Sequence, residues 1–218
     1  MTDPFPELEE EQTPQERAAG LKTFRIVVWV LVALVAGVGL FAFFGPDRHN
    51  GPGEPTDYGD TVGGAFSLTA PDGSTVTDQT LSGKPFAIFF GFTRCPDVCP
   101  TTLSRLAQLR TRMGEDGDKF RIVFVSVDPG YDSPEDIGRY VDLFDTPIIG
   151  LTGSDEAIAK TADAYHAFYQ KVPVEGGDYT IDHTAAVYLM DADGKLQSII
   201  DYHESPETSL AKLERLVG

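Results

Sequence analysis

The chain has 218 residues, with 34 acidic and 17 basic side chains, a formal net charge of −17 and two cysteines. The acidic excess runs through most of the chain, since residues 46–218 hold 28 acidic and 14 basic side chains. Such a surface repels phosphate backbones, which argues against nucleic acid as a partner. Two cysteines are too few for a small disulfide-built scaffold.

Residues 26–44 (IVVWVLVALVAGVGLFAFF) are nineteen consecutive apolar residues. At about 1.5 Å per residue a helix of this length spans roughly 28 Å, close to the thickness of a bilayer's hydrocarbon core. The run is longer than the apolar region of a signal peptide, and no small-residue cleavage pattern follows it. We expect a single retained transmembrane helix; a cleaved signal peptide and a buried core helix are the alternatives.

The orientation of this helix follows from the basic residues that flank it. Arg17, Lys22 and Arg25 precede the span, and only Arg48 follows it closely. Residues 1–25 are therefore predicted to be a cytoplasmic tail, with the rest of the chain on the periplasmic side of a bacterial inner membrane. The mitochondrial intermembrane space is the alternative, although the tail does not resemble a transit peptide.

Residues 45–64 contain six glycines and three prolines with almost no large apolar side chain, which predicts a flexible linker. The remaining residues, 65–218, are enough for one domain with its own core. We therefore expect four parts: a tail, a membrane anchor, a linker and a single globular domain.

Strand and helix patterns alternate along this domain. Hairpins are predicted at 66–77 and 184–200, buried strands at 85–92, 121–127 and 147–153, and helices from Pro100, over 133–144 with a Ser133–Asp136 capping box, from Ser154 and over 206–217. This order indicates an α/β domain with a mixed sheet flanked by helices. The first long strand leads directly into a cysteine-bearing loop and a helix, an arrangement that resembles the thioredoxin fold.

The stretch GFTRCPDVCP (91–100) holds both cysteines, Cys95 and Cys99. As a structural disulfide they would close a very short loop and add little stability. As a redox pair they lie at a helix N-terminus beside Arg94, which lowers a thiol pKa, but the spacing is one residue longer than C-x-x-C. As metal ligands they are soft thiolates one helical turn apart, suited to Cu(I), zinc or iron–sulfur chemistry, and they need a further ligand.

Four histidines are candidates for that ligand. His49 lies in the linker, His166 in a helical pattern and His203 in a polar stretch. His183 differs, because it stands at the start of the buried-type strand in YTIDHTAAVYLM. In a thioredoxin-like topology the loop that enters this strand lies beside the cysteines, so His183 is the best candidate, with a structural histidine as the alternative.

Four motifs in this order resemble the SCO/SenC family of membrane-tethered copper proteins. They are GKPFAIFFGFTRCPDVCPTTL (83–103), VFVSVDP (123–129), IIGLTGS (148–154) and YTIDHTAAVYLMDADG (179–194). The resemblance implies a thioredoxin-like fold that holds one copper ion, Cu(I) or Cu(II), through Cys95, Cys99 and His183. Asp128 and Asp182 are candidates to orient these ligands, with a surface or turn role as the alternative for each. Two thiolates and an imidazole suit three-coordinate Cu(I), whereas structural zinc takes a fourth ligand.

The resemblance also implies a function: delivery of copper to the binuclear copper site of cytochrome c oxidase subunit II, reduction of that site's cysteines, or both. An upstream copper donor and a thioredoxin-like reductant are the further partners expected. The alternative is a membrane-tethered thiol–disulfide oxidoreductase or thiol peroxidase that uses Cys95 and Cys99, so the sequence leaves open whether the protein is an enzyme. A copper or redox sensor is a third interpretation.

Two departures from the expected patterns bear on these alternatives. The family commonly carries an arginine shortly after VDP, where this chain has Gly130 and Tyr131. Thioredoxin-like oxidoreductases usually place a cis-proline at the entry to the late strand. Here the corresponding DHT has no proline, which favours metal binding over general disulfide exchange.

Overall fold

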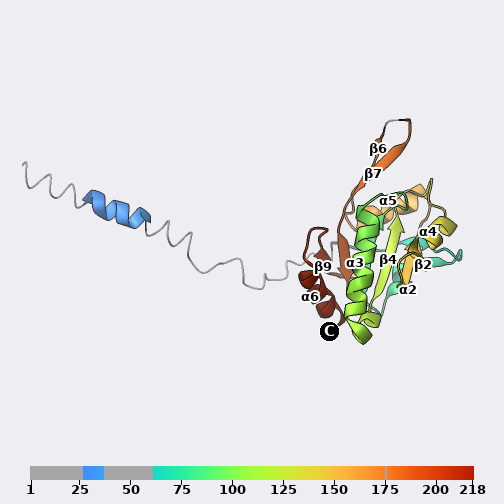
Figure 1. Cartoon of the computed structure of the whole chain (residues 1–218), viewed down its shortest axis with the longest axis horizontal. Coiled ribbons are helices and arrows are strands. Elements are labelled where there is room, and N and C mark those ends of the chain that lie inside the picture. The colour runs from blue at the N-terminus through green and yellow to red at the C-terminus, as the bar shows by residue number, and fades with distance from the viewer. Residues whose placement is uncertain (1–26, 37–60, 175) are drawn as a thin grey trace, which may run out of the picture. The chain divides into compact units, whose positions relative to one another are not determined.

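The computed structural model describes residues 27–36, 61–174 and 176–218. The chain divides into two compact units, Met1–Glu54 and Pro55–Gly218. In the first unit, residues 27–36 form a helix, blue in Figure 1. The rest of the predicted anchor, the tail and most of the linker lie outside the described residues. No helix within the described part of the chain is both long and apolar enough to cross a bilayer.

The C-terminal unit is built on a five-stranded mixed sheet (Figure 1). Its strands are Phe86–Gly91 (β3), Arg121–Ser126 (β4), Ile148–Leu151 (β5), Val187–Met190 (β8) and Leu196–Ile200 (β9). They lie in the order β5–β4–β3–β8–β9, with β3, β4 and β5 parallel and the other two pairings antiparallel. Every residue of β3 is buried, as expected for a continuous apolar run that is covered on both faces.

Helices cover both faces of this sheet. They are Val98–Arg112 (α3), Pro134–Val141 (α4), Asp155–Ala164 (α5) and Pro206–Val217 (α6). Neighbouring residues of a strand point to opposite faces. Gly91 of β3 faces Cys99 of α3, while the Phe90 ring packs on Tyr165 at the end of α5, with centroids 5.4 Å apart. Helices α3 and α5 therefore cover opposite faces of β3, and the fold is thioredoxin-like as predicted.

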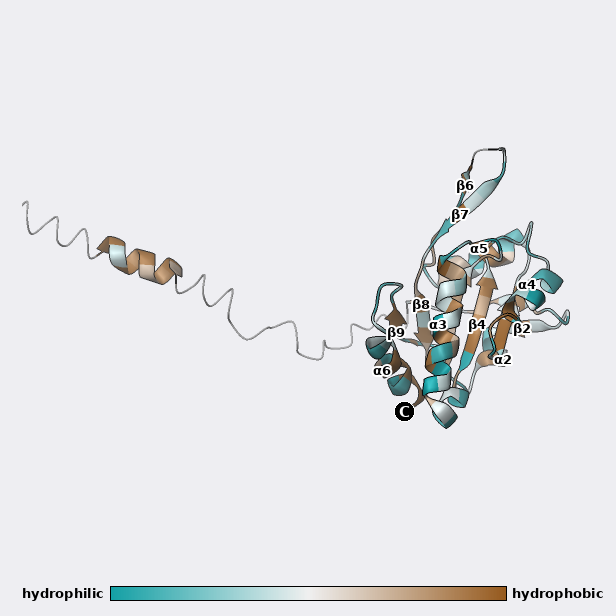
Figure 2. Ribbon diagram, in the orientation of Figure 1, coloured by the Kyte–Doolittle hydropathy of each residue, from teal (hydrophilic) through white to brown (hydrophobic). Residues whose placement is uncertain are grey.

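Helices α4 and α5 begin at the polar capping residues that the sequence predicts. Ser133 and Asp136 form a capping box at the start of α4, and Ser154 caps α5. The predicted N-terminal hairpin is present as Ser67–Thr69 (β1) paired with Thr75–Thr77 (β2). In Figure 2 the interior strand β4 is mostly brown, whereas much of α6 is teal, as expected for a covered strand and a surface helix.

Several elements differ from the predictions. Helix α3 begins at Val98, so Cys99 lies in its first turn. A short helix, Asp78–Leu81 (α2), and a 3₁₀ helix, Gly114–Lys119 (η1), were not predicted. Nor was the hairpin formed by Tyr169–Pro173 (β6) and Tyr179–His183 (β7), which projects from the body in Figure 1.

The prediction that His183 starts a buried strand is therefore wrong, because His183 ends β7 and β8 begins four residues later. The sequence pattern does not indicate this hairpin, and the reason is physical. Most of its described side chains are exposed or half-buried, so it lacks the apolar alternation by which strands are recognised.

Gly91 provides the space in which the second cysteine packs. A Cβ atom on Gly91 would lie 2.6 Å from the Cys99 sulfur and 3.0 Å from the ring of Phe124. Both neighbours are fully buried, and close-packed interiors do not accommodate an added methyl group without rearrangement. The end of β3 therefore needs glycine in order to admit the sulfur.

Gly91→Ala is expected to lower the free energy of unfolding by about 1–3 kcal/mol, because it overpacks the core. Urea denaturation of residues 55–218, followed by circular dichroism, measures this change. Gly130→Ala is the matched control, since the nearest atom to its added methyl group is the Lys171 Nζ at 4.0 Å. The control should change stability by less than about 0.5 kcal/mol; equal stability of the two variants would contradict the packing argument.

Candidate metal centre

Cys95, Cys99 and His183 meet at one place in the structure. Their donor atoms, two sulfurs and one imidazole nitrogen, all lie within 4.8 Å of one another. Cys95 comes from the loop after β3, Cys99 from the first turn of α3 and His183 from the end of β7. Both cysteines are free thiols. This is the only such group of histidine, cysteine and acidic side chains found among the described residues.

The Cys95 sulfur lies at the N-terminus of α3. The N-cap residue, Asp97, makes no side-chain capping hydrogen bond. Instead the backbone N–H of Cys99 donates to the Cys95 sulfur at 3.4 Å. A helix N-terminus carries unsatisfied N–H groups and partial positive charge, both of which stabilise a thiolate. The loop therefore aims Cys95 at a position that favours its ionised form.

His183 is held in a fixed orientation with Nε2 toward the thiols. Its Nδ1–H donates to the carbonyl oxygen of Thr184 at 3.1 Å, and Nε2 lies 3.4 Å from the Cys99 sulfur. A carbonyl can only accept, so Nδ1 carries a proton, and Nε2 is the ring nitrogen that faces the thiols. The rings of Phe89 and Phe92 pack edge-on against the imidazole, with centroids 5.8 and 5.9 Å away.

The two thiols differ sharply in acidity. The pKa of Cys95 is lowered to about 4, first by a hydrogen bond from the Cys99 thiol and then by His183 and by backbone N–H groups. The pKa of Cys99 is raised, because it holds the proton shared with Cys95 and is buried. At neutral pH the pair therefore carries one proton and one negative charge. Cys95 is 9% exposed and Cys99 is fully buried.

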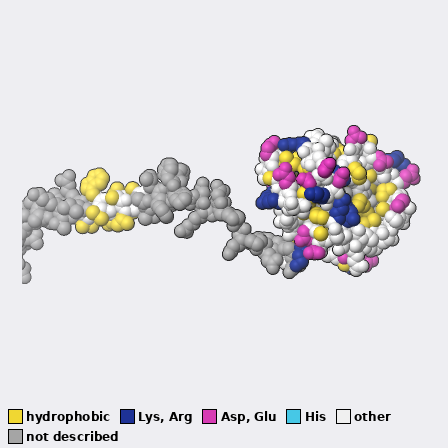
Figure 3. Space-filling model, turned by 90° about the horizontal axis from the view of Figure 1, so that it is seen from below, with side chains coloured by type: hydrophobic (Ala, Val, Ile, Leu, Met, Phe, Trp, Pro, Cys, Tyr) yellow, Lys and Arg dark blue, Asp and Glu magenta, His cyan; other side chains and the backbone are white. Residues whose placement is uncertain are grey.

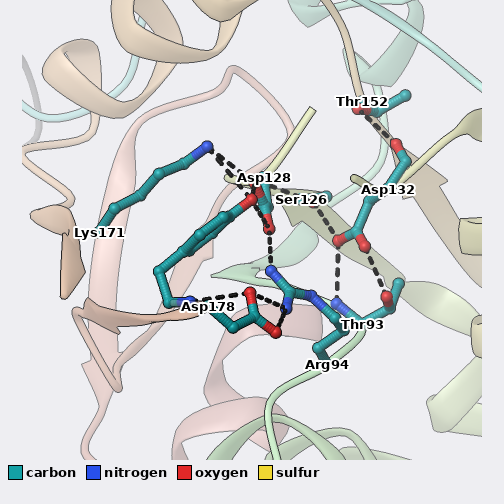
Figure 4. A network of polar contacts seen from close by, with 9 residues as sticks. Thr93, Arg94, Ser126, Asp128, Asp132, Thr152, Lys171 and Asp178 are labelled. Carbon is teal, nitrogen blue, oxygen red and sulfur yellow. Dashed lines mark hydrogen bonds and ion pairs between the residues drawn. The ribbon is translucent and has the colours of Figure 1, made fainter. Parts of the chain in front are cut away.

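Asp128 is fully buried beside this centre and joins the segments around it (Figure 4). Its carboxylate accepts hydrogen bonds from Arg94 Nη2 at 3.2 Å and from the Tyr179 hydroxyl at 2.8 and 3.0 Å. Lys171 Nζ of β6 lies 3.1 Å away. A buried carboxylate needs such partners, and here they come from the cysteine loop and from both strands of the hairpin.

A second buried carboxylate, Asp132, was not singled out from the sequence. It accepts hydrogen bonds from the backbone N–H of Thr93 at 2.9 Å and from the Thr93 and Ser126 hydroxyls, both at 2.5 Å. These bonds fix the loop two residues before Cys95 (Figure 4). The available signal was the position of Asp132 shortly after the apolar run of β4, where loops from neighbouring parallel strands meet.

The remaining candidates lie elsewhere. Asp182 is exposed, and neighbouring strand residues point to opposite faces, so its side chain points away from that of His183. His166 contacts the carbonyl oxygen of Thr61 at 3.0 Å, and His203 is exposed beside Tyr202. His49 lies outside the described residues.

The acidic excess of the chain is not gathered in one continuous patch on the face shown in Figure 3. Acidic and basic side chains are interspersed there among hydrophobic ones. Charge on this face is therefore that of an ordinary solvated surface, and it does not by itself identify a partner.

The fold and the site together define a thioredoxin-like domain whose cysteine loop faces an imidazole from a projecting hairpin. The sequence model of SCO1/SenC matches residues 54–218, and the chain belongs to this family.

Known relatives support this assignment. The chain is 42% identical over 133 residues to protein SCO1 homolog 1, mitochondrial, of Arabidopsis thaliana, a match that covers 61% of this chain and 40% of that protein. It is 37% identical over 147 residues to protein SenC of Rhodobacter capsulatus, covering 67% of this chain and 66% of the relative.

Among solved structures, that of Bradyrhizobium japonicum ScoI with copper bound matches with a TM-score of 0.66 and 46% identity. The match covers 71% of this chain and 99% of ScoI.

In the wild-type chain, iodoacetamide should alkylate Cys95 well before Cys99. Because the lowered pKa keeps Cys95 ionised above about pH 4, its rate should change little between pH 6 and pH 8. Cys99→Ala removes the largest cause of this lowering, so the pKa of Cys95 rises and its alkylation rate becomes pH-dependent in that range. Peptide mass spectrometry measures both, with urea-unfolded chain as the reference. Identical pH profiles for the two chains would contradict the shared-proton arrangement.

Proposed function

We propose that this chain binds one copper ion through the sulfurs of Cys95 and Cys99 and the Nε2 atom of His183. The observation that carries the proposal is the convergence of these three donor atoms within 4.8 Å. The copper-bound structure of Bradyrhizobium japonicum ScoI, at 46% identity, supports the choice of metal.

The donor set itself also favours copper. Two thiolates and one imidazole form a soft, three-coordinate set that suits Cu(I), whereas structural zinc takes four ligands. No fourth histidine, cysteine or acidic side chain joins the group within the described part of the chain. Copper binding requires both cysteines as thiolates, so it displaces the proton that the pair shares in the free protein.

We further propose that the protein is a metallochaperone, for which copper is cargo. Its acceptor is the binuclear copper site of cytochrome c oxidase subunit II, and an upstream protein supplies the ion. A disulfide between Cys95 and Cys99 would remove both thiolate ligands, so a thioredoxin-like reductant is needed to keep the site loadable. The same thiols would reduce a disulfide of the acceptor site and would themselves be oxidised to the Cys95–Cys99 disulfide.

A second candidate function is thiol–disulfide exchange or peroxide reduction. The low pKa and partial exposure of Cys95 favour it, since the thiolate is the nucleophile in such reactions. This function needs both cysteines and does not need His183. Turnover of a disulfide or peroxide substrate that survives in His183→Ala would therefore distinguish it from copper delivery.

We also propose that residues 26–44 anchor the protein in a bacterial inner membrane. The tail then lies in the cytoplasm, residues 45–64 form a flexible linker, and the domain of residues 65–218 lies in the periplasm. The large apolar side chains of the described helical segment, residues 27–36, are exposed, which suits a lipid environment.

The anchor can be tested by fractionation. The full-length chain, expressed in a Gram-negative bacterium, should sediment with membranes and resist extraction by carbonate. A chain that starts at residue 55 and is exported by a separate signal peptide should appear in the soluble periplasmic fraction. Recovery of both chains in the soluble fraction would contradict the membrane anchor.

Copper binding and copper transfer can be measured in one experiment, and binding comes first. The purified chain should hold about one Cu(I), measured by competition with a chromogenic chelator. His183→Ala should weaken binding, because it removes one of three ligands, and Cys95→Ser and Cys99→Ser should abolish it. His203→Ala is the matched control, since His203 is exposed and outside the group. Unchanged affinity in His183→Ala would overturn the ligand assignment.

The loaded chain is then mixed with the apo copper domain of subunit II. Mass spectrometry should show copper on the acceptor and the free dithiol on the donor. A donor recovered with a Cys95–Cys99 disulfide, together with an acceptor whose disulfide has become a dithiol and carries no copper, would support thiol reduction in place of metal delivery.

A further inference from the structure

Arg94, the residue immediately before Cys95, reaches across to the hairpin that carries His183. Its Nη1 donates to both carboxylate oxygens of Asp178, at 3.2 and 3.1 Å, and its Nη2 donates to Asp128. Asp178 directly precedes β7, and β7 ends at His183. One guanidinium therefore joins the loop that presents the first sulfur to the hairpin that presents the imidazole (Figure 4).

Two tyrosine rings hold the same guanidinium. The Arg94 Cζ atom lies 4.0 Å from the ring centroid of Tyr131 and 4.7 Å from that of Tyr179. Rings at this distance attract a cation, and a planar guanidinium can stack on them while it forms paired hydrogen bonds. A lysine at this position would keep the charge and lose both the stacking and the paired bonds. The contact therefore uses features specific to arginine.

Besides Arg94, the hairpin is attached to the body by Tyr179 and Lys171, which bind Asp128, and by the packing of Ile181 and His183 near the end of β7. Strands β6 and β7 pair with each other and with none of the five strands of the main sheet. At its base, Phe168 and Thr184 exchange two hydrogen bonds of 2.9 Å. Among the described residues of the two strands, Ile181 is the only buried side chain. Polar contacts of Arg94 and Asp128 therefore set the position of the hairpin together with this packing.

The sulfur ligands do not share this dependence. Cys99 is fixed in α3 against Gly91, and the loop before Cys95 is fixed by the bonds of Thr93 to Asp132. If the hairpin moves, His183 moves with it, while both sulfurs keep their places. Loosening the contacts of Arg94 therefore affects one ligand selectively.

We propose that Arg94 is a positioning residue, which latches the β6–β7 hairpin to the cysteine loop and so determines how long a bound copper ion is retained. This inference rests on the proposed copper-binding function. The latch consists of Arg94 with Asp178, Tyr131 and Tyr179. With the latch closed, His183 completes the three-ligand set; with the latch open, the ion is left on the two thiolates and exchanges faster.

The first test compares rates of copper release from the full-length chain, in detergent, to an excess of a Cu(I) chelator. Arg94→Gln should release copper about tenfold faster, the usual scale for losing a partner that orients a metal ligand. Arg94→Lys should fall between this variant and the wild type. Arg139→Gln is the matched control and should release at the wild-type rate, because the ion pairs of Arg139 within the described part of the chain are with Glu135 and Asp136 of its own helix. A wild-type rate in Arg94→Gln would overturn the latch.

The second test repeats the comparison in a His183→Ala background. A latch that acts through His183 has nothing left to position there, so Arg94→Gln should cause no further acceleration. Equal acceleration in both backgrounds would overturn the proposal, because it would assign the effect to the charge of Arg94 beside the thiolates.

The third test needs no copper. In the free protein, amide hydrogen exchange in residues 169–174 and 176–183 should be faster in Arg94→Gln, while exchange in β3 stays unchanged. Unchanged exchange in the hairpin would show that Arg94 does not hold it. This measurement is independent of the metal, so it tests the latch even if the wild-type chain does not bind copper. Failure of the wild-type chain to bind copper would refute the proposed function and leave the result for the latch standing.

Discussion

The Cys99 sulfur lies in the space that a side chain on Gly91 would fill, and the position of the metal centre follows from this contact. Strand β3 is buried along its whole length, so its end is fixed by packing on both faces. Helix α3 starts seven residues later, with its first turn packed against that end. The short loop between them has little freedom, and it places the Cys95 sulfur where the first N–H groups of α3 can reach it.

The ionisation of the two thiols suits this packed site to a soft cation. The two sulfurs share one proton, because Cys95 is stabilised as a thiolate while buried Cys99 stays protonated. The nearby carboxylates of Asp128 and Asp132 are engaged by hydrogen bonds from the surrounding loops. The centre therefore offers two sulfurs and one imidazole nitrogen, a donor set that favours Cu(I).

The three ligands differ in how firmly they are held. Both sulfurs belong to the packed body, whereas His183 ends a hairpin that pairs with no strand of the main sheet. A carrier must bind its cargo tightly and also give it up, and ligand exchange is easier when one of the donors can withdraw. The division into a fixed dithiol and a hairpin-borne imidazole suits such a carrier better than it suits a permanent structural metal site.

The sequence by itself determined the α/β order, the buried strands and the starts of α4 and α5, because apolar runs and capping residues such as Ser133 and Ser154 act locally. It also identified the cysteine pair, since two thiols one helical turn apart carry their chemistry in their spacing. The position of His183 was decided only by the tertiary structure, because the hairpin that bears it is exposed and has no apolar period. The same holds for Arg94 and Asp132, whose partners lie far away along the chain. Such contacts depend on which loops lie next to one another beyond the ends of the parallel strands. Local sequence patterns do not predict which loops these are.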